Sequence, residues 1–297
     1  MNAVLKKELF LLFKTPAAWL FSGFFLLTGG ILFCIYQLNM GIGDFSYTLS
    51  VLKYYFIPAV PFLTMGIFAD EKRQKTEPLL LTAPVSITKI TAGKFIAVFA
   101  AFSLPVFVSL VFPIITGIIS KTGNGANHLF GTDPGIIFAS YTGFYLNGLC
   151  SVSAGLFFSS LTDNPPFAGI VTFLFLLFLT CAEPIGLLLP GSRFASLVFS
   201  GILLIIISVT AFRLTGSIPA GAVFATLGAL IIGLTLVMNP PFFDHLIQRA
   251  AKSISFSSRF RNYSMGIISI GSLFFSILFI FTAFFSTVQI QLRKRWV

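Results

Sequence analysis

The sequence predicts an all-α polytopic membrane protein with about eight transmembrane helices. Hydrophobic residues make up 56% of the 297 residues and charged residues only 9%, whereas a typical soluble domain is about 25% charged. The mean hydropathy is +0.96. Apolar runs close to the ~20 residues that cross a bilayer recur along the whole chain, so its length is counted in membrane spans.

The distribution of charge argues against nucleic acid as a partner. The net charge is +10, but the basic residues gather between apolar runs and form no continuous basic face of a soluble domain. Lys and Arg collect on the cytoplasmic side of membrane proteins, and this topological rule explains the excess. We therefore expect a multi-pass protein of the bacterial cytoplasmic membrane.

Residues 2–14, NAVLKKELFLLFK, predict an interfacial helix. The apolar residues can share one face, and Lys6, Lys7 and Glu8 lie beside it. This pattern suits a helix lying flat at the membrane surface, and a simple extension of the first span is the alternative. The uncharged run that follows is too long for the core of a cleavable signal, so we expect it to remain as an anchor.

Eight segments predict spanning helices. Lys53 is expected at the mouth of the second span, and the fifth is expected to end near Glu183, because a proline disfavours helix for the residue before it. The ranges are about Ala17–Leu38, Leu52–Ala69, Thr91–Ser120, Pro134–Leu161, Phe167–Leu189, Phe194–Phe212, Ile218–Met238 and Met265–Leu292.

The positive-inside rule orients these spans with both termini cytoplasmic, as an even number of spans requires. This orientation places twelve Lys and Arg residues inside and seven outside. Four of the outer seven lie in residues 239–264, where Phe242, Phe243, Leu246 and Ile247 precede Arg249 and Lys252. This pattern predicts an extracytoplasmic amphipathic segment, and Phe256 and Phe260 can continue its apolar face.

Signatures of catalysis and metal binding are missing from the sequence. No GxxxxGK[ST], HExxH or GxSxG stretch occurs, and neither His128 nor His245 belongs to a cluster with metal-ligand spacing. Within the spans, Glu183 is the one candidate for a coupling-ion site, and we interpret it as interfacial. The chain is therefore expected to bind no cofactor or metal, and any energy for transport comes from elsewhere.

Charge is concentrated in FADEKRQKTEPLLLTAPVSITKITAGKF, from Phe68 to Phe95. Residues 70–94 form the longest cytoplasmic connection that the predicted topology contains. The alternative, without further information, is an ordinary positive-inside loop.

This stretch resembles a signature of the ABC type 2 transporter permeases, most closely the gliding-motility-type subclass. The family pattern reads F-A-E-E-K-R-x-G-T-x-E-x-L-L-T-x-P-V, followed by G-K-F at the third span. Asp70 stands where Glu is usual and Lys75 where Gly is usual. The KKEL stretch before Thr15 and Pro16, and the closing RKRWV, resemble the two ends of family members.

The resemblance implies a single permease domain over 1–297, with a six-helix core and an inserted helix pair at 192–238. Residues 70–94 would be a coupling segment whose short helix docks on an ABC ATPase subunit. The contact residues implied are Asp70, Glu71, Lys72, Arg73, Thr76, Glu77, Leu79, Leu80, Leu81 and Pro84. Two permease copies and two ATPase subunits, which hold ATP and Mg, would assemble, with an extracytoplasmic accessory protein as a further partner.

The expected activity is export, or extraction from the membrane, of a hydrophobic or amphipathic substrate such as a lipid or peptide. Two alternatives stay open. One is a mechanotransmission complex that drives an extracytoplasmic partner without transport, and the other is a passive channel or scaffold.

Overall fold

The computed structural model describes residues 2–76, 86–122, 133–215, 226–227, 230, 233–236 and 240–295, and every regular element among them is a helix. The chain groups into two compact units. Unit 1 is Met1–Phe178 with Arg259–Val297, and unit 2 is Leu179–Ser258.

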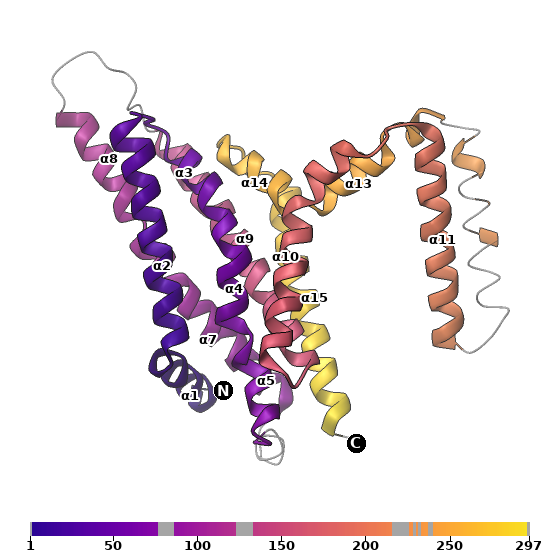
Figure 1. Cartoon of the computed structure of the whole chain (residues 1–297), viewed down its shortest axis with the longest axis horizontal. Helices are drawn as coiled ribbons and strands as arrows, with labels where there is room; N and C mark the ends of the chain where they lie inside the picture. Colours follow the sequence, from indigo (N-terminus) through magenta and orange to yellow (C-terminus); the bar gives the residue numbers. More distant parts are fainter. Residues whose placement is uncertain are drawn as a thin grey trace. The chain divides into compact units, whose positions relative to one another are not determined.

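Unit 1 is a bundle of long helices and shorter helical segments (Figure 1). Its elements are α1 (Asn2–Lys14), α2 (Pro16–Phe33) continued by a π-helix (Cys34–Asn39), α3 (Phe45–Leu52), a 3-10 turn (Lys53–Tyr55), α4 (Phe56–Thr64), α5 (Gly66–Arg73), α7 (Ile87–Val108), α8 (Val111–Thr122), α9 (Pro134–Leu161), the first part of α10 (Pro165–Leu188), most of α14 (Phe256–Ser264) and α15 (Ile270–Arg295).

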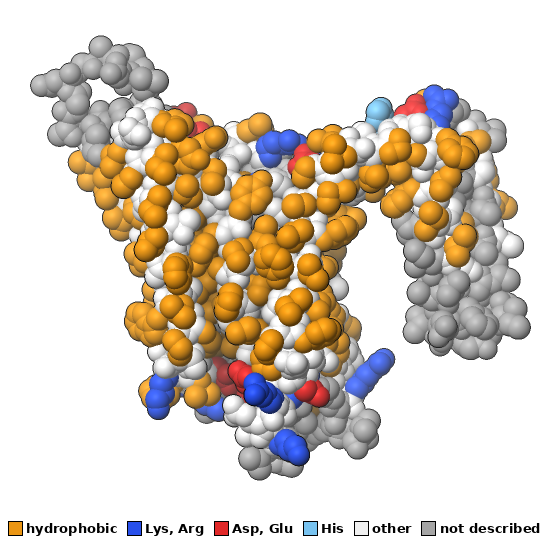
Figure 2. Space-filling model, in the orientation of Figure 1, with side chains coloured by type: hydrophobic (Ala, Val, Ile, Leu, Met, Phe, Trp, Pro, Cys, Tyr) orange, Lys and Arg blue, Asp and Glu red, His pale blue; other side chains and the backbone are white. Residues whose placement is uncertain are grey.

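Six helical stretches within the described residues are long and apolar enough to cross a membrane. They are Pro16–Asn39, Phe45–Arg73, Ile87–Ile118, Pro134–Leu161, Pro165–Leu188 and Ile270–Arg293. Hydrophobic side chains cover the sides of these helices, and charged side chains gather toward their ends (Figure 2). This confirms an all-α polytopic membrane protein.

Helix α9 is the centre of unit 1, and α3, α4, α5, α7 and α15 pack against it. Two glycines allow this close packing. A Cβ on Gly148 would lie 2.0 Å from the Phe102 ring of α7, and one on Gly155 would lie 2.2 Å from Thr64 Oγ1 of α4. The buried Phe144 ring lies 4.7 Å from that of Phe56, so aromatic contacts fill the space between these helices.

The second span begins at Phe45, before the predicted Leu52, and the expectation that Lys53 lies at its mouth is wrong. Asp44 caps the helix, because its carboxylate accepts hydrogen bonds from Ser46 N at 2.9 Å and Ser46 Oγ at 2.7 Å. Lys53 is therefore two helical turns inside the stretch. It is 9% exposed, and its Nζ lies 5.1 Å from the centroid of the Phe260 ring.

Two other expectations about the spans differ from the structure: the range predicted for the fifth span, Phe167–Leu189, agrees with α10, but the expectation that this helix ends near Glu183 is wrong. Helix α10 passes through Pro184 and ends at Leu188. Its last turn packs closely against Ala251 within unit 2, since a Cβ on Gly186 would lie 2.4 Å from the Ala251 Cβ. Helix α15 begins at Ile270 rather than Met265, because Gly266 adopts a φ of 78° and turns the chain after α14.

Unit 2 contains the end of α10, α11 (Arg193–Thr215), a 3-10 turn (Pro240–Phe243) and α13 (Leu246–Ile254). Helix α11 covers the predicted sixth span. Only its first part, Arg193–Ile202, is an apolar helix among the fully described residues, and this part is too short by itself to cross a membrane. The predicted seventh span lies mostly outside the described residues, so eight spans stay a prediction. Helices α13 and α14 occupy the segment predicted to be amphipathic.

Candidate functional site

The end of unit 1 where α5 stops and α7 starts carries the charged connection, and we name it the connection end. Helix α1 lies across this end (Figure 1). The chain turns between α1 and α2 at Thr15, whose Oγ1 donates a hydrogen bond to Leu12 O at 2.8 Å. Trp19 Nε1 of α2 donates a hydrogen bond to Phe13 O in the last turn of α1 at 2.8 Å, which fixes the turn between the two helices.

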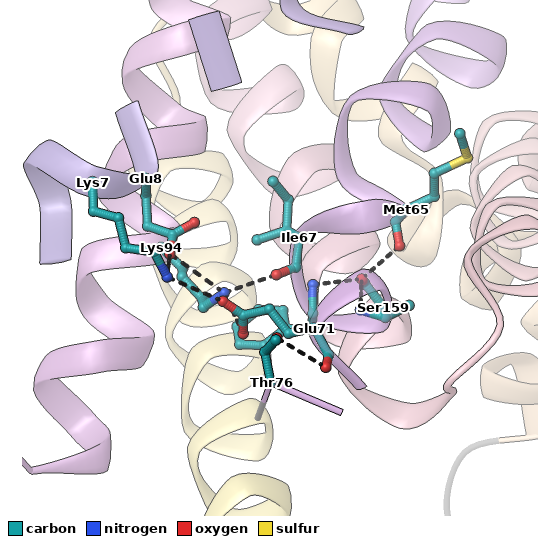
Figure 3. Close-up of polar contacts among 10 residues, drawn as sticks. Lys7, Glu8, Met65, Ile67, Glu71, Thr76, Lys94 and Ser159 are labelled. Atoms are coloured by element: carbon teal, nitrogen blue, oxygen red, sulfur yellow. Dashed lines mark hydrogen bonds and ion pairs between the residues drawn. The ribbon is translucent and has the colours of Figure 1, made fainter. Parts of the chain in front are cut away.

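A buried charge cluster, made of Lys7, Glu8, Glu71 and Lys94, joins three helices at the connection end (Figure 3). Lys94 of α7 is 1% exposed. Its Nζ lies 2.8 Å from Glu71 Oε2 of α5 and 3.7 Å from Glu8 Oε1 of α1. The same Nζ donates a hydrogen bond to Ile67 O at 2.8 Å.

The buried charge cluster is formally neutral, with two cations and two anions. Lys7 is about half exposed and lies 3.6 Å from Glu8 Oε1 and 3.8 Å from Glu71 Oε1. A charge removed from water is tolerated when it is paired, and removal of one partner typically costs about 3–5 kcal/mol. The cluster therefore fixes the relative positions of α1, α5 and α7.

Helix α5 is also fastened to α9 by a buried serine. Ser159 Oγ accepts hydrogen bonds from the backbone N–H of Phe68 at 3.2 Å and of Ala69 at 3.3 Å. It donates to Met65 O at 2.9 Å (Figure 3). One hydroxyl thus satisfies three backbone groups of the second span.

Lys72 adds a second connection between α5 and the end of α9. Its Nζ donates a hydrogen bond to Ser160 O and lies 3.7 Å from Asp163 Oδ1. The Lys72 side chain is 3% exposed, whereas that of Asp163 is 76% exposed. Helix α5 is therefore held by α1 and α7 through one set of contacts and by α9 through another.

The exit from α5 is a Schellman motif. Thr76 N donates to Glu71 O at 2.9 Å and Lys75 N donates to Lys72 O at 3.0 Å. Lys75 has a φ of 56°, in the left-handed region that usually requires glycine. Of the two positions where this chain departs from the pattern that it resembles, Lys75 is therefore the one where the backbone favours the missing glycine.

The sequence-predicted site residues divide into two groups in the structure. Asp70 and Arg73 are exposed, whereas Glu71 and Lys72 are turned inward and hold α5. Thr76 is half-buried, with Oγ1 donating to Glu71 O at 3.2 Å. On α1, Lys6 and Lys7 are exposed, and Glu8 is buried. Five further predicted residues lie outside the described residues: Glu77, Leu79, Leu80, Leu81 and Pro84.

The sequence predictions missed the structural roles of Lys94, Ser159 and Asp163. The position of Lys94 before a long apolar run is itself a signal for a paired charge. Nothing in the sequence distinguishes Ser159 from the other serines of α9.

The family model described as ABC-2 family transporter protein matches residues 2–203. A search of curated proteins finds no match to the chain. The matched residues include all of the buried charge cluster, Ser159 and Lys72, and five of the six membrane-competent stretches. This family supplies the membrane permease component of ABC transporters and implies an ABC ATPase as partner. The chain therefore belongs to the ABC-2 family of transporter proteins.

Proposed function

We propose that the chain is the permease subunit of an ATP-driven exporter whose separate ATPase subunit docks at the connection end, in the cytoplasm. Its cargo would be hydrophobic or amphipathic, such as a lipid or a peptide. The observation that carries this proposal is the position of α5. This helix contains the first residues of the proposed coupling segment, 70–94, and is fastened to α1, α7 and α9 by buried charges and hydrogen bonds.

The contacts of α5 support a mechanical role. A force applied to residues 77–85 reaches α5 through the Schellman motif at its end. Helix α5 cannot move away from α7 or α1 without separating Lys94 from Glu71 and Glu8. It cannot leave α9 without exposing the backbone groups that Ser159 satisfies. The four helices would therefore move together, as packed elements do in rigid-body transitions.

Asp70 and Arg73 are the described residues that we assign to direct contact with the ATPase. Both side chains are exposed and lie one turn apart on α5, and in the sequence they come shortly before residues 77–85. Leu79, Leu80 and Leu81 would add apolar contact, as the family resemblance implies. ATP and Mg would be bound by the ATPase, with two ATPase subunits serving a homodimer of permeases. Membership of the gliding-motility-type subclass, and an extracytoplasmic accessory protein, belong to the same proposal.

The test uses the full chain with its ATPase in proteoliposomes that contain a fluorescent lipid or a fluorescent hydrophobic peptide. Asp70→Arg with Arg73→Asp should abolish co-purification of the ATPase, while Lys252→Glu, a reversal on exposed α13, should leave it intact. ATP-dependent movement of either probe supports export. Hydrolysis that moves neither probe favours the mechanotransmission alternative, and retention of the ATPase by the Asp70 and Arg73 double variant would contradict the docking assignment.

A further inference from the structure

An apolar groove lies between α7, α9 and α15 in unit 1. Its volume is about 490 Å³. The lining residues are all hydrophobic, and they are Ala92, Phe95, Ile96 and Phe99 of α7, Leu146 and Leu149 of α9, and Ile277, Ile280, Phe281 and Phe284 of α15. Ile277 and Phe281 are about 60% exposed. The groove therefore opens sideways, on a face of α15 that other described residues leave uncovered.

The groove and Lys89 together extend over about one leaflet of a bilayer. Lys89 lies on the same stripe of α7 as Ala92 and Ile96, at spacings of three and seven residues. From Lys89 to Phe99 the helix rises roughly 15 Å at ~1.5 Å per residue. This is about half of the ~30 Å hydrocarbon core. The apolar lining itself, from Ala92 to Phe99, rises roughly 10 Å. Lys89, an exposed cation, thus stands at headgroup level one turn beyond a groove that covers part of an acyl chain.

The mouth of the groove at the connection end is basic. No acidic residue occurs in α7, α9 or α15. Helix α15 ends at this side of unit 1, and its last turns contain the exposed Arg293. Lys94, the other cation of α7, lies on the opposite face from Ala92 and is paired with Glu71. The charge available at the mouth therefore complements an anion.

We propose that this groove binds an anionic phospholipid, with an acyl chain against α7, α9 and α15 and the phosphate at Lys89. The site lies in the leaflet at the connection end, which is the cytoplasmic leaflet in the orientation proposed above. That leaflet supplies anionic lipids whose charge attracts basic residues near the surface. The bound lipid fills the groove from the membrane side, and the inference holds whatever cargo the transporter moves.

The test uses the full chain in phosphatidylcholine vesicles doped with phosphatidylglycerol that carries a diazirine in one acyl chain. Light-induced adducts are mapped by mass spectrometry. We expect them to concentrate on residues 92–99 and 277–284. Phosphatidylcholine with the same diazirine should label these residues about five-fold less. This factor corresponds to the attraction of one basic residue for an anionic lipid surface. Water-soluble glycerophosphate should not compete, because the apolar groove provides part of the binding.

Two variants and their controls separate the headgroup from the acyl chain. Lys89→Glu should remove the preference for phosphatidylglycerol, whereas Lys14→Glu, an exposed cation of α1, should not. Ala92→Trp should suppress adducts in the groove, and Leu104→Trp, on an exposed part of α7 outside the groove, should leave them unchanged. All four positions are partly or fully exposed, so each variant should fold.

Three results would overturn the proposal. One is labelling spread evenly over other exposed apolar faces, such as that of α2, and another is equal labelling by the two lipids. The third is that the groove stays unlabelled while Ile96→Cys forms a disulfide between two chains, since a second copy would then cover it. None of these results bears on docking of the ATPase, so the two proposals fail independently.

Discussion

Lys94 Nζ and Glu71 Oε2 lie 2.8 Å apart and join α7 to α5, with the lysine side chain 1% and the glutamate side chain 20% exposed. Such a pair adds little net stability compared with apolar residues of the same size, because both ions lose hydration. Its geometry is nevertheless specific, since Glu8 of α1 shares the same ammonium group at 3.7 Å. The pair therefore joins α5 to α7 and, through Glu8, to α1.

Removal of the Lys94 charge should destabilise the protein strongly. Lys94→Met leaves the buried Glu8 and the partly buried Glu71 with only the half-exposed Lys7 as a nearby cation among the described residues. We expect a loss toward the lower end of about 3–5 kcal/mol in the free energy of unfolding. The triple variant Glu8→Gln, Glu71→Gln, Lys94→Met should recover most of that loss. Denaturant unfolding in detergent measures both. Equal stability of the single and triple variants would show that the carboxylates of Glu8 and Glu71 do not cause the loss.

A glycine at position 75 should stabilise the protein. Lys75 is exposed and has a φ of 56°, a conformation that costs an L-residue roughly 1–2 kcal/mol. Lys75→Gly should therefore raise the free energy of unfolding by about 1 kcal/mol, whereas Lys75→Ala should not, because alanine keeps the Cβ. A matched pair of thermal unfolding curves tests this. A gain of the same size with alanine would attribute the effect to the lost charge.

The Ser159 hydroxyl should contribute more to the free energy of unfolding than the hydroxyl of a serine that bonds only within its own helix. Ser159→Ala leaves two backbone N–H groups and one carbonyl of the second span without this partner, and we expect a cost of about 1–3 kcal/mol. Ser153 is a matched control, because it is buried on the same helix and bonds only to Leu149 O one turn earlier. Similar costs for Ser153→Ala and Ser159→Ala would argue against a specific link between α5 and α9.

Unit 2 contains an acid-sensitive contact. Arg193 Nε lies 2.6 Å from Asp244 Oδ1, and hydrogen bonding to Arg193 lowers the pKa of the Asp244 carboxyl below its usual 3.8. Because the pKa of Asp244 is lower in the folded than in the unfolded chain, the contact stabilises the protein fully at pH values above the unfolded-state pKa. The stabilisation disappears as the pH falls through the folded-state pKa. Both groups are exposed, so the effect should be small.

Limited proteolysis at residues 189–192 as a function of pH measures this contact, because Gln248 Nε2 and His245 N also bond to that loop. Cleavage should rise only at pH values below 3.8 in the unaltered chain. Asp244→Asn should show raised cleavage at neutral pH with no further acid step. An identical acid profile in both proteins would assign the step to other groups.

The sequence predicted the elements that depend on local patterns. Long apolar runs gave four spans within a few residues, and the charged motif located α5. The early start of the second span was also readable, because Asp44 precedes Phe45 and Ser46 as a helix cap does. Continuation of α10 past Pro184 was not, since contacts of Gly186 and Leu189 with α13 residues maintain that turn.

The sequence predicted which kinds of residue gather at the connection end, but not which of these residues pair with one another. The motif predicted Glu71 and Lys72 as contacts of the ATPase, which stays a prediction, and in the structure both side chains face α1, α7 or α9. The choice of Glu8 and Lys94 as partners depends on how α1 crosses the bundle, which no local pattern specifies. The Lys75 departure was informative, because a family glycine indicates a positive φ.

The most direct test of the account follows α5 relative to its neighbours during the ATPase cycle. Spin labels at exposed positions Gln74, Lys6 and Asn164 report the separations of α5 from α1 and from the end of α9, with labelled chains diluted by unlabelled ones. We predict that both separations stay unchanged when ATP is added to the assembled transporter, and that the α5–α1 separation broadens in the triple neutral variant. A clear ATP-induced change in either separation of the unaltered chain would contradict the claim that these helices move as one body.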